Sequence, residues 1–135
     1  MKIKNLKAFT LLEILIAFGI LAVIVPLFLF SLPQASQADR ISRAKTSAIY
    51  LAQEKLEEYL SYSYADIPIG MIEAKSALTE VEFSRFQREV STIWVDEDYN
   101  QADFDTGLKK ITVTIYWQEN GRDYQEALNS LKVQP

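Results

Sequence analysis

The chain has 135 residues, enough for one small domain and a membrane anchor, and carries a formal net charge of −4. It contains no histidine and no cysteine. These absences exclude thiolate zinc sites, Cys-His nucleophilic sites and a histidine general base, so the composition weighs against an enzyme. No disulfide can hold the fold together, and packing must do so instead.

Residues 1–8 form a short basic leader with lysine at positions 2, 4 and 7. Residues 9–33 form an apolar segment in which Glu13 is the only charged residue. About 20 apolar helical residues cross the hydrocarbon core of a bilayer, so this segment predicts one membrane-spanning helix. Basic residues before the segment and acidic residues after it predict a cytoplasmic N-terminus and an exported C-terminal domain.

Two other interpretations of the apolar segment stay open. A cleaved secretory signal peptide usually has a shorter apolar core of ~7–15 residues, followed by a small-residue cleavage site. An uncut signal anchor fits the length of the segment without any processing.

Residues 34–62 predict the amphipathic half of the same helix. Apolar residues recur there at three- and four-residue steps, which places them on one stripe. The predicted stripe consists of Ile41, Ala44, Ala48, Leu51, Ala52, Leu56, Tyr59 and Leu60. We therefore expect one helix from about residue 9 to residue 62, kinked at Pro26 and Pro33 because proline removes a backbone donor.

Residues 63–135 predict the antiparallel sheet region of the exported domain. Residues 71–81 are expected to be a loop with a short helical turn, 82–95 a strand and 96–107 an acidic loop. Residues 111–117 alternate apolar and polar side chains, and Asn120-Gly121 is typical of a two-residue hairpin turn before a partner strand over 124–133. The expected fold class is α+β, with one long N-terminal helix packed on a small antiparallel sheet.

The region after the apolar segment has 11 Lys and Arg residues against 17 Asp and Glu residues, a formal charge of −6. This charge disfavours nucleic acid as a partner. The acidic loop offers oxygen ligands for calcium at Asp96, Asp98, Asn100, Asp103 and Asp105. It departs from the calcium-loop pattern at Gln101 and Gly107, and a solvated acidic turn is the alternative. No other cofactor is expected.

Glu13 is a carboxylate in an apolar membrane segment, where it is costly and needs a partner. Cleavage between Ala8 and Phe9 would create a new α-amine at Phe9, and Glu13 of one subunit could pair with that amine on a neighbour. The alternative is that Glu13 reaches the cytoplasmic headgroups and pairs with Lys7. The residues alone leave both interpretations open.

The segment Lys7-Ala8-Phe9-Thr10-Leu11-Leu12-Glu13, with the apolar run behind it, resembles the cleavage and methylation segment of type IV pilins and type II secretion pseudopilins. The resemblance covers about the first 30 residues. It implies that a prepilin peptidase cuts between Ala8 and Phe9 and methylates the Phe9 amine. It also implies that Phe9 and Glu13 guide filament assembly. Ala8 stands where the family usually has glycine, and we expect processing with no more than a reduced rate.

The exported domain is similar in layout to minor subunits of the family, such as the V-type minor pilin and the I-type minor pseudopilin. The resemblance implies a pilin-like fold and a structural subunit of a type IV pilus or a secretion-like filament. The implied partners are other pilin or pseudopilin subunits, the prepilin peptidase and the assembly platform. The implied location is the inner membrane and then the filament. The alternative is an unprocessed single-pass envelope protein whose exported domain binds a partner protein.

Overall fold

The structure is a computed structural model that describes residues 10–135, and between residues 31 and 35 it describes the backbone only. The chain divides into two compact units, Met1–Arg40 and Ile41–Pro135. Helix α1, Leu11–Ser61, contributes its first part to one unit and its second part to the other. The predicted helix over 9–62 is thus confirmed within the described residues. The helix continues through Pro26 and Pro33, so neither proline ends it, and a kink at either one stays a prediction.

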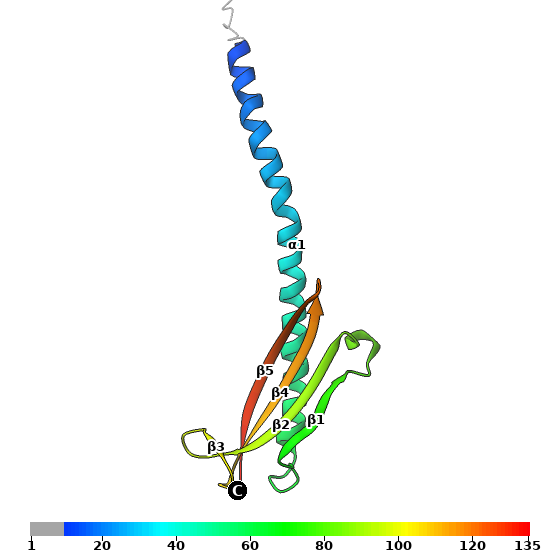
Figure 1. The fold of residues 1–135 in the computed structure, drawn as a ribbon, viewed down its shortest axis with the longest axis vertical. Coiled ribbons are helices and arrows are strands. Elements are labelled where there is room, and N and C mark those ends of the chain that lie inside the picture. Colours follow the sequence, from blue (N-terminus) through cyan, green and yellow to red (C-terminus); the bar gives the residue numbers. More distant parts are fainter. Residues whose placement is uncertain (1–9) are drawn as a thin grey trace, which may run out of the picture. The chain divides into compact units, whose positions relative to one another are not determined.

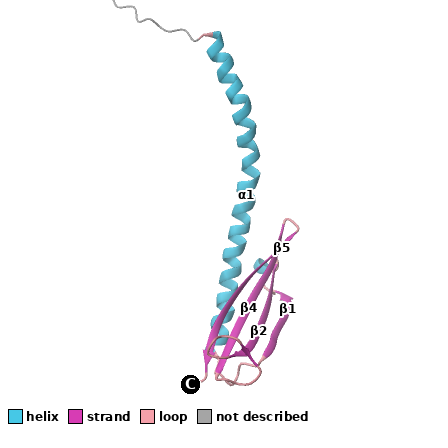
Figure 2. Cartoon of the chain, turned by 60° about the vertical axis from the view of Figure 1, so that its left-hand side comes forward, coloured by secondary structure: helices cyan, strands magenta, loops and turns pink. Residues whose placement is uncertain are grey.

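The second unit contains an antiparallel sheet that covers one side of α1 (Figures 1 and 2). Its strands are β1 (Gly70–Ala77), β2 (Phe86–Val95), β4 (Leu108–Glu119) and β5 (Arg122–Val133), in the order β1-β2-β4-β5. A two-residue strand, β3 (Gln101–Ala102), pairs with the end of β2. The α+β class and the small antiparallel sheet behind a helix are therefore as predicted.

Two local predictions were wrong. Residues 71–81 were expected to form a loop, but most of them belong to the edge strand β1. The strand expected over 82–95 begins only at Phe86, because Val81–Phe83 is a short 3-10 helix. The register between β1 and β2 shifts twice, between Met71 and Glu73 and between Glu73 and Ser76. These shifts break the period of two by which a strand is recognised from its sequence.

The core of the second unit lies between α1 and the inner face of the sheet. Ala44, Ala48 and Ala52 are fully buried and follow one another at four-residue steps, so the helix backbone can approach the sheet closely. The predicted stripe is confirmed at its buried positions Ala44, Ala48, Leu51, Ala52, Leu56 and Tyr59. The sheet contributes Phe86 and Val90 from β2 and Ile111, Val113, Ile115 and Trp117 from β4.

Strands β4 and β5 form a hairpin around Asn120 and Gly121. Both residues have positive φ, 51° and 73°, which is the conformation of a two-residue type I′ turn. The register then runs from Glu119 opposite Arg122 to Leu108 opposite Val133 without a shift. The Asn-Gly pair and the alternation of β4 therefore predicted the hairpin correctly.

Candidate functional site

The first unit presents an apolar helical surface. Leu11–Phe30 is a 20-residue segment with a mean hydropathy of 2.7, none of which is buried by another part of the described chain. It is long and apolar enough to cross a membrane. An exposed surface of this kind needs lipid or protein to cover it, because apolar side chains are unfavourable in water.

Glu13 lies in the first turn of α1. Its N–H donates to the Thr10 hydroxyl at 3.3 Å and to the Thr10 carbonyl at 3.0 Å, so Thr10 caps the helix. A carboxylate in the first turn also interacts favourably with the helix dipole. Within residues 10–135, no cation pairs with the Glu13 carboxylate. Ala8 and Phe9, the predicted cleavage and methylation positions, lie outside the described residues.

The acidic loop that was considered for calcium uses its carboxylates to order its own backbone. Oδ1 of Asp96 accepts hydrogen bonds from the N–H groups of Asp98, at 3.0 Å, and Asn100, at 2.8 Å. Oδ1 of Asp105 accepts from the Tyr64 hydroxyl and, at 2.9 Å, from the N–H of Gly107. In the described part of the chain, no three acidic residues are grouped so that they could hold a metal ion.

A buried lysine fixes the segment that follows α1. Lys109 of β4 is only 5% exposed, and its Nζ donates to the carbonyls of Tyr64 and Ile67, both at 2.7 Å. The same Nζ lies 4.2 Å from the centroid of the Tyr64 ring. Burial and the hydrogen bond to Asp105 raise the pKa of Tyr64 to about 12, and that bond lowers the pKa of Asp105. Lys109 thus binds the backbone carbonyl of Tyr64, and Asp105 binds its hydroxyl, so both ends of the residue are fixed.

A second lysine reaches the end of α1 from the neighbouring strand. Lys132 of β5 stands directly opposite Lys109, and its Nζ donates to the carbonyl of Leu60 at 2.7 Å. Like charges directly opposite each other on a sheet are unfavourable. Here the two ammonium groups bind carbonyls instead: Lys132 binds Leu60 in the last turn of α1, and Lys109 binds Tyr64 and Ile67 just after it. The last turn of α1 has no basic residue of its own, so these lysines supply the positive charge that a helix C-terminus favours.

An ionic cluster joins α1 to β1 and β2. Glu73 of β1 accepts from Lys55 at 2.8 Å, from the Tyr59 hydroxyl at 3.0 Å and from Nε of Arg88 at 3.0 Å. Burial acts to raise the pKa of Glu73, but these three hydrogen bonds outweigh it and lower the pKa below its ordinary value. The cluster is half-buried, because the side chains of Glu73 and Arg88 are about a quarter exposed. It closes the β1 side of the core.

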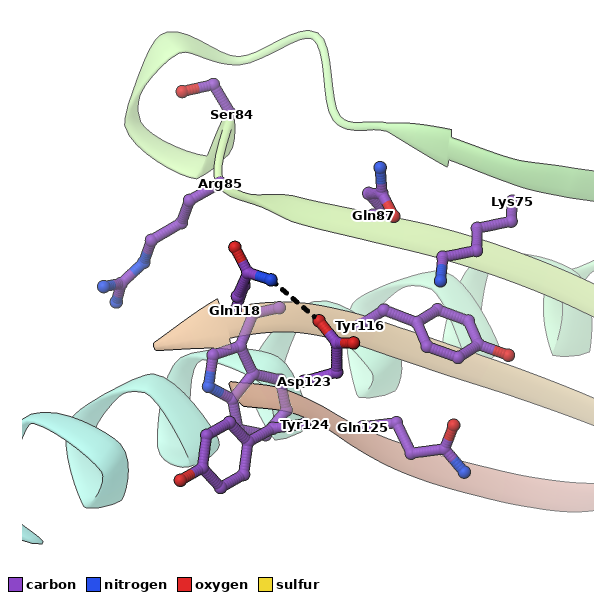
Figure 3. Close-up of a pocket in the computed structure, with 10 residues that line it drawn as sticks. Lys75, Ser84, Arg85, Gln87, Tyr116, Gln118, Asp123, Tyr124 and Gln125 are labelled. Carbon is purple, nitrogen blue, oxygen red and sulfur yellow. Dashed lines mark hydrogen bonds between the residues drawn. The ribbon is translucent and has the colours of Figure 1, made fainter. Parts of the chain in front are cut away.

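Figure 3 shows a cavity of the second unit, with a volume of about 510 Å³. Gln87, Tyr116 and Gln125 stand opposite one another on β2, β4 and β5, on the sheet face that points away from α1. Nζ of Lys75 lies 3.9 Å from the centroid of the Tyr116 ring, and Nε2 of Gln118 donates to Asp123 at 3.1 Å. The lining therefore offers hydrogen-bonding groups from β2, β4 and β5.

Sequence reasoning did not identify the polar groups that hold the domain together. Lys109 occurs in phase with Ile111, Val113 and Ile115, so its inward position could have been found from the alternation of β4. Glu73 could not be placed in the same way, because β1 was not recognised as a strand. Two aromatic side chains of the strands lie in the core, Phe86 at 1% exposure and Trp117 at 5%.

Comparisons with protein-family models, with curated proteins and with solved structures found no match for this chain.

Proposed function

We propose that this chain is a minor pilin or minor pseudopilin, a structural subunit of a type IV pilus or a type II secretion-like filament. The observation that carries the proposal is the exposed apolar segment Leu11–Phe30, which has Glu13 as its only charged residue. Such a segment suits two environments in succession. Lipid covers it before assembly, and the corresponding helices of neighbouring subunits cover it in the filament.

Glu13 supports the assembly role because its carboxylate has no cation among residues 10–135. Removal of residues 1–8 by a prepilin peptidase would place the α-amine of Phe9 at the start of the mature chain. Pairing of that amine with Glu13 of a neighbour would remove the cost of burying either charge alone. The domain from Ile41 onward would be carried outside the inner membrane, with an N-terminus that is cytoplasmic before cleavage. The work of the protein would be mechanical rather than enzymatic.

Processing is tested by intact-mass spectrometry of the protein extracted from its native membrane. We expect a mature chain that begins at Phe9 and carries one added methyl group. An Ala8→Gly variant serves as the matched control and should be cut at least as fast, because glycine has no Cβ to accommodate in the peptidase groove. A chain that retains Met1 would contradict processing and would favour an unprocessed single-pass protein whose exported domain binds a partner.

The role of Glu13 is tested by incorporation of variants into filaments. Glu13→Gln keeps the shape of the side chain but removes its charge, and we expect loss of incorporation with normal membrane insertion. Glu54→Gln changes a carboxylate on the exposed side of the same helix and should assemble normally. Normal incorporation of Glu13→Gln would show that the carboxylate acts only on the first turn of its own helix.

A further inference from the structure

Another cavity of the second unit lies between α1 and the loop that joins β1 to β2, and the proposed function assigns nothing to it. Its volume is about 340 Å³. The helix and the region around the loop both contribute to its lining, which consists of Leu51, Glu54, Lys55, Glu58, Leu78, Glu80, Phe83 and Arg88.

The apolar part of the lining is a firm surface. Leu51 and Leu78 are each 8% exposed and belong to the core of the domain. Phe83 is partly buried against the same core, and its ring centroid lies 6.5 Å from that of Phe86. An apolar surface that is already packed in this way can accept an aliphatic chain without rearrangement.

Two carboxylates in the lining have no partner. Glu54 of α1 and Glu80, directly before the 3-10 helix, are both exposed. Glu80 stands at the N-cap position of the 3-10 helix, but its side chain makes no capping hydrogen bond. Among residues 10–135, no cation or hydrogen-bond donor binds either carboxylate. One free negative charge therefore comes from the helix and one from the loop.

The two cations of the lining are already neutralised. Lys55 pairs with Glu58 at 2.9 Å and with Glu73 at 2.8 Å, and Arg88 pairs with Glu73 at 3.0 Å. Together with the two free carboxylates, four acidic groups stand against two basic ones, a formal charge of −2 at the cavity itself. A ligand that brings positive charge is favoured here, and an anion is not.

Exposed apolar side chains stand beside both free carboxylates. Tyr50 is 69% exposed and lies one helical turn before Glu54, on the same face of α1. Val81 is 91% exposed and directly follows Glu80. Both sides of the cavity therefore carry apolar surface in addition to charge, which is the mixture that protein–protein contacts use.

We propose that this cavity binds a basic side chain, an arginine or a lysine, that a partner protein presents beside apolar residues of its own. The aliphatic stem of that side chain lies on Leu51, Leu78 and Phe83, and its charged end reaches Glu54 and Glu80. The apolar residues of the partner cover Tyr50 and Val81.

A side chain of a protein fits the surface better than a free amine does. A small alkylamine has few non-hydrogen atoms and leaves Tyr50 and Val81 uncovered, so its binding is weak. The proposal is also separate from filament assembly, which we assign to the apolar segment Leu11–Phe30. Glu54→Gln should therefore still enter filaments while it weakens binding at the cavity.

The test is an NMR titration of the full chain in nonionic detergent micelles. The probe is a blocked tripeptide with arginine between two glycines, and we expect it to shift the Leu51 and Leu78 methyl signals and the Phe83 ring signals. The dissociation constant should be about 1 to 10 mM. Citrulline has the shape of arginine without its charge, and a citrulline tripeptide should bind at least about threefold more weakly. A glutamate tripeptide should not shift these signals.

Variants of the carboxylates locate the binding. Glu80→Gln should weaken binding of the arginine tripeptide by about threefold, and the double variant Glu54→Gln/Glu80→Gln by about tenfold. Glu82→Gln is the matched control, because Glu82 is an exposed carboxylate of the same loop that does not line the cavity. It should bind like the unchanged chain. Unchanged signals of the buried Ile111 and Val113 show that each variant is folded.

A second probe separates a protein side chain from a free amine. A blocked tripeptide with arginine between two valines should bind about threefold more tightly than the glycine tripeptide, because the valines bury apolar surface of Tyr50 and Val81. Val81→Ser should reduce this gain. The variant should fold normally, since Val81 is exposed.

The following results would overturn the proposal. One is that the arginine tripeptide leaves the Leu51, Leu78 and Phe83 signals unchanged. Another is that the citrulline or glutamate tripeptide binds as tightly as the arginine one, or that Glu82→Gln weakens binding as much as Glu80→Gln. Equal binding of the valine and glycine tripeptides would assign the cavity to a free amine. None of these results depends on cleavage at Phe9 or on filament formation, so they are distinct from failure of the proposed function.

Discussion

At the scale of single residues, the domain from Ile41 onward depends on a few charged side chains at positions where apolar ones are expected. Lys109 and Glu73 point toward α1 from the inner face of the sheet, and both are fully engaged. A buried charge is tolerated only when its hydrogen-bonding groups are satisfied. These residues therefore join the segments around the core rather than fill it.

Replacing Lys109 tests this role. Lys109→Met keeps a long side chain but leaves the carbonyls of Tyr64 and Ile67 without their donor. We expect the free energy of unfolding, measured by urea denaturation of the full chain in detergent, to fall by about 2 to 4 kcal/mol. Lys110→Met changes the next residue, on the opposite face of β4, and should alter stability by no more than about 0.5 kcal/mol. Equal losses in the two variants would contradict the role of Lys109.

Glu73 predicts a dependence of stability on acid pH. Its pKa is lower in the folded state than its ordinary value of 4.5, despite burial, because Lys55, Arg88 and Tyr59 donate to the carboxylate. A lowered carboxyl pKa gives stabilisation that is complete above pH 4.5 and is lost as the pH falls through the folded-state pKa. The free energy of unfolding should therefore decline below this pH, and Glu73→Gln should show a shallower decline. Glu80→Gln, at an exposed carboxylate, should retain the decline of the unchanged chain.

At the scale of elements, the parts with regular periods could be predicted and the irregular parts could not. The buried stripe of α1 and the alternation of β4 are regular, so their core residues were identified correctly. The edge strand β1 carries Glu73 on its inward side and two register shifts, and neither feature is visible as a pattern. The cavity beside Glu80 could not be inferred either, because it lies between α1 and a loop that is distant from it in the sequence.

The hairpin turn gives a prediction at this scale. Gly121 has φ of +73°, and a Cβ added there would meet nothing within 4 Å, so only the backbone conformation restricts this position. Gly121→Ala should lower the free energy of unfolding by about 1 kcal/mol, because L-residues are strained at positive φ. Asn120→Gly keeps the turn compatible with its φ of 51° and should change stability by only a few tenths of a kcal/mol. Chemical denaturation of both variants measures the difference.

At the scale of the whole molecule, the chain combines an apolar segment that no described residue covers with an acidic domain that has its own core. The length and composition of the apolar segment were evident from the sequence, because they require no tertiary contact. The pairing of Glu13 with Phe9 is of a different kind, because it concerns two subunits and a residue outside the described range. It therefore stays a prediction.

Membrane insertion of the apolar segment is tested by a charge at its centre. Leu21→Arg places a guanidinium near the middle of Leu11–Phe30, at a cost of about 3 kcal/mol for a helix centre. We expect a large shift of the protein from the carbonate-washed membrane fraction to the soluble or aggregated fractions. Tyr50→Arg, at a side chain that is 69% exposed in the second unit, should leave the fractionation unchanged. Retention of Leu21→Arg at the level of the unchanged chain would contradict a membrane span.

The contacts between α1 and the strands also determine how the domain would respond to force. Lys45 pairs with Glu126 near the beginning of the domain's helix, and Lys132 and Lys109 hold the carbonyls of Leu60, Tyr64 and Ile67 at and beyond its end. A pull applied at Ile41 along the helix would shear it against β4 and β5, and these contacts would bear the load together rather than one after another. The domain should therefore resist tension along the helix better than a pull that peels β5 away from the sheet.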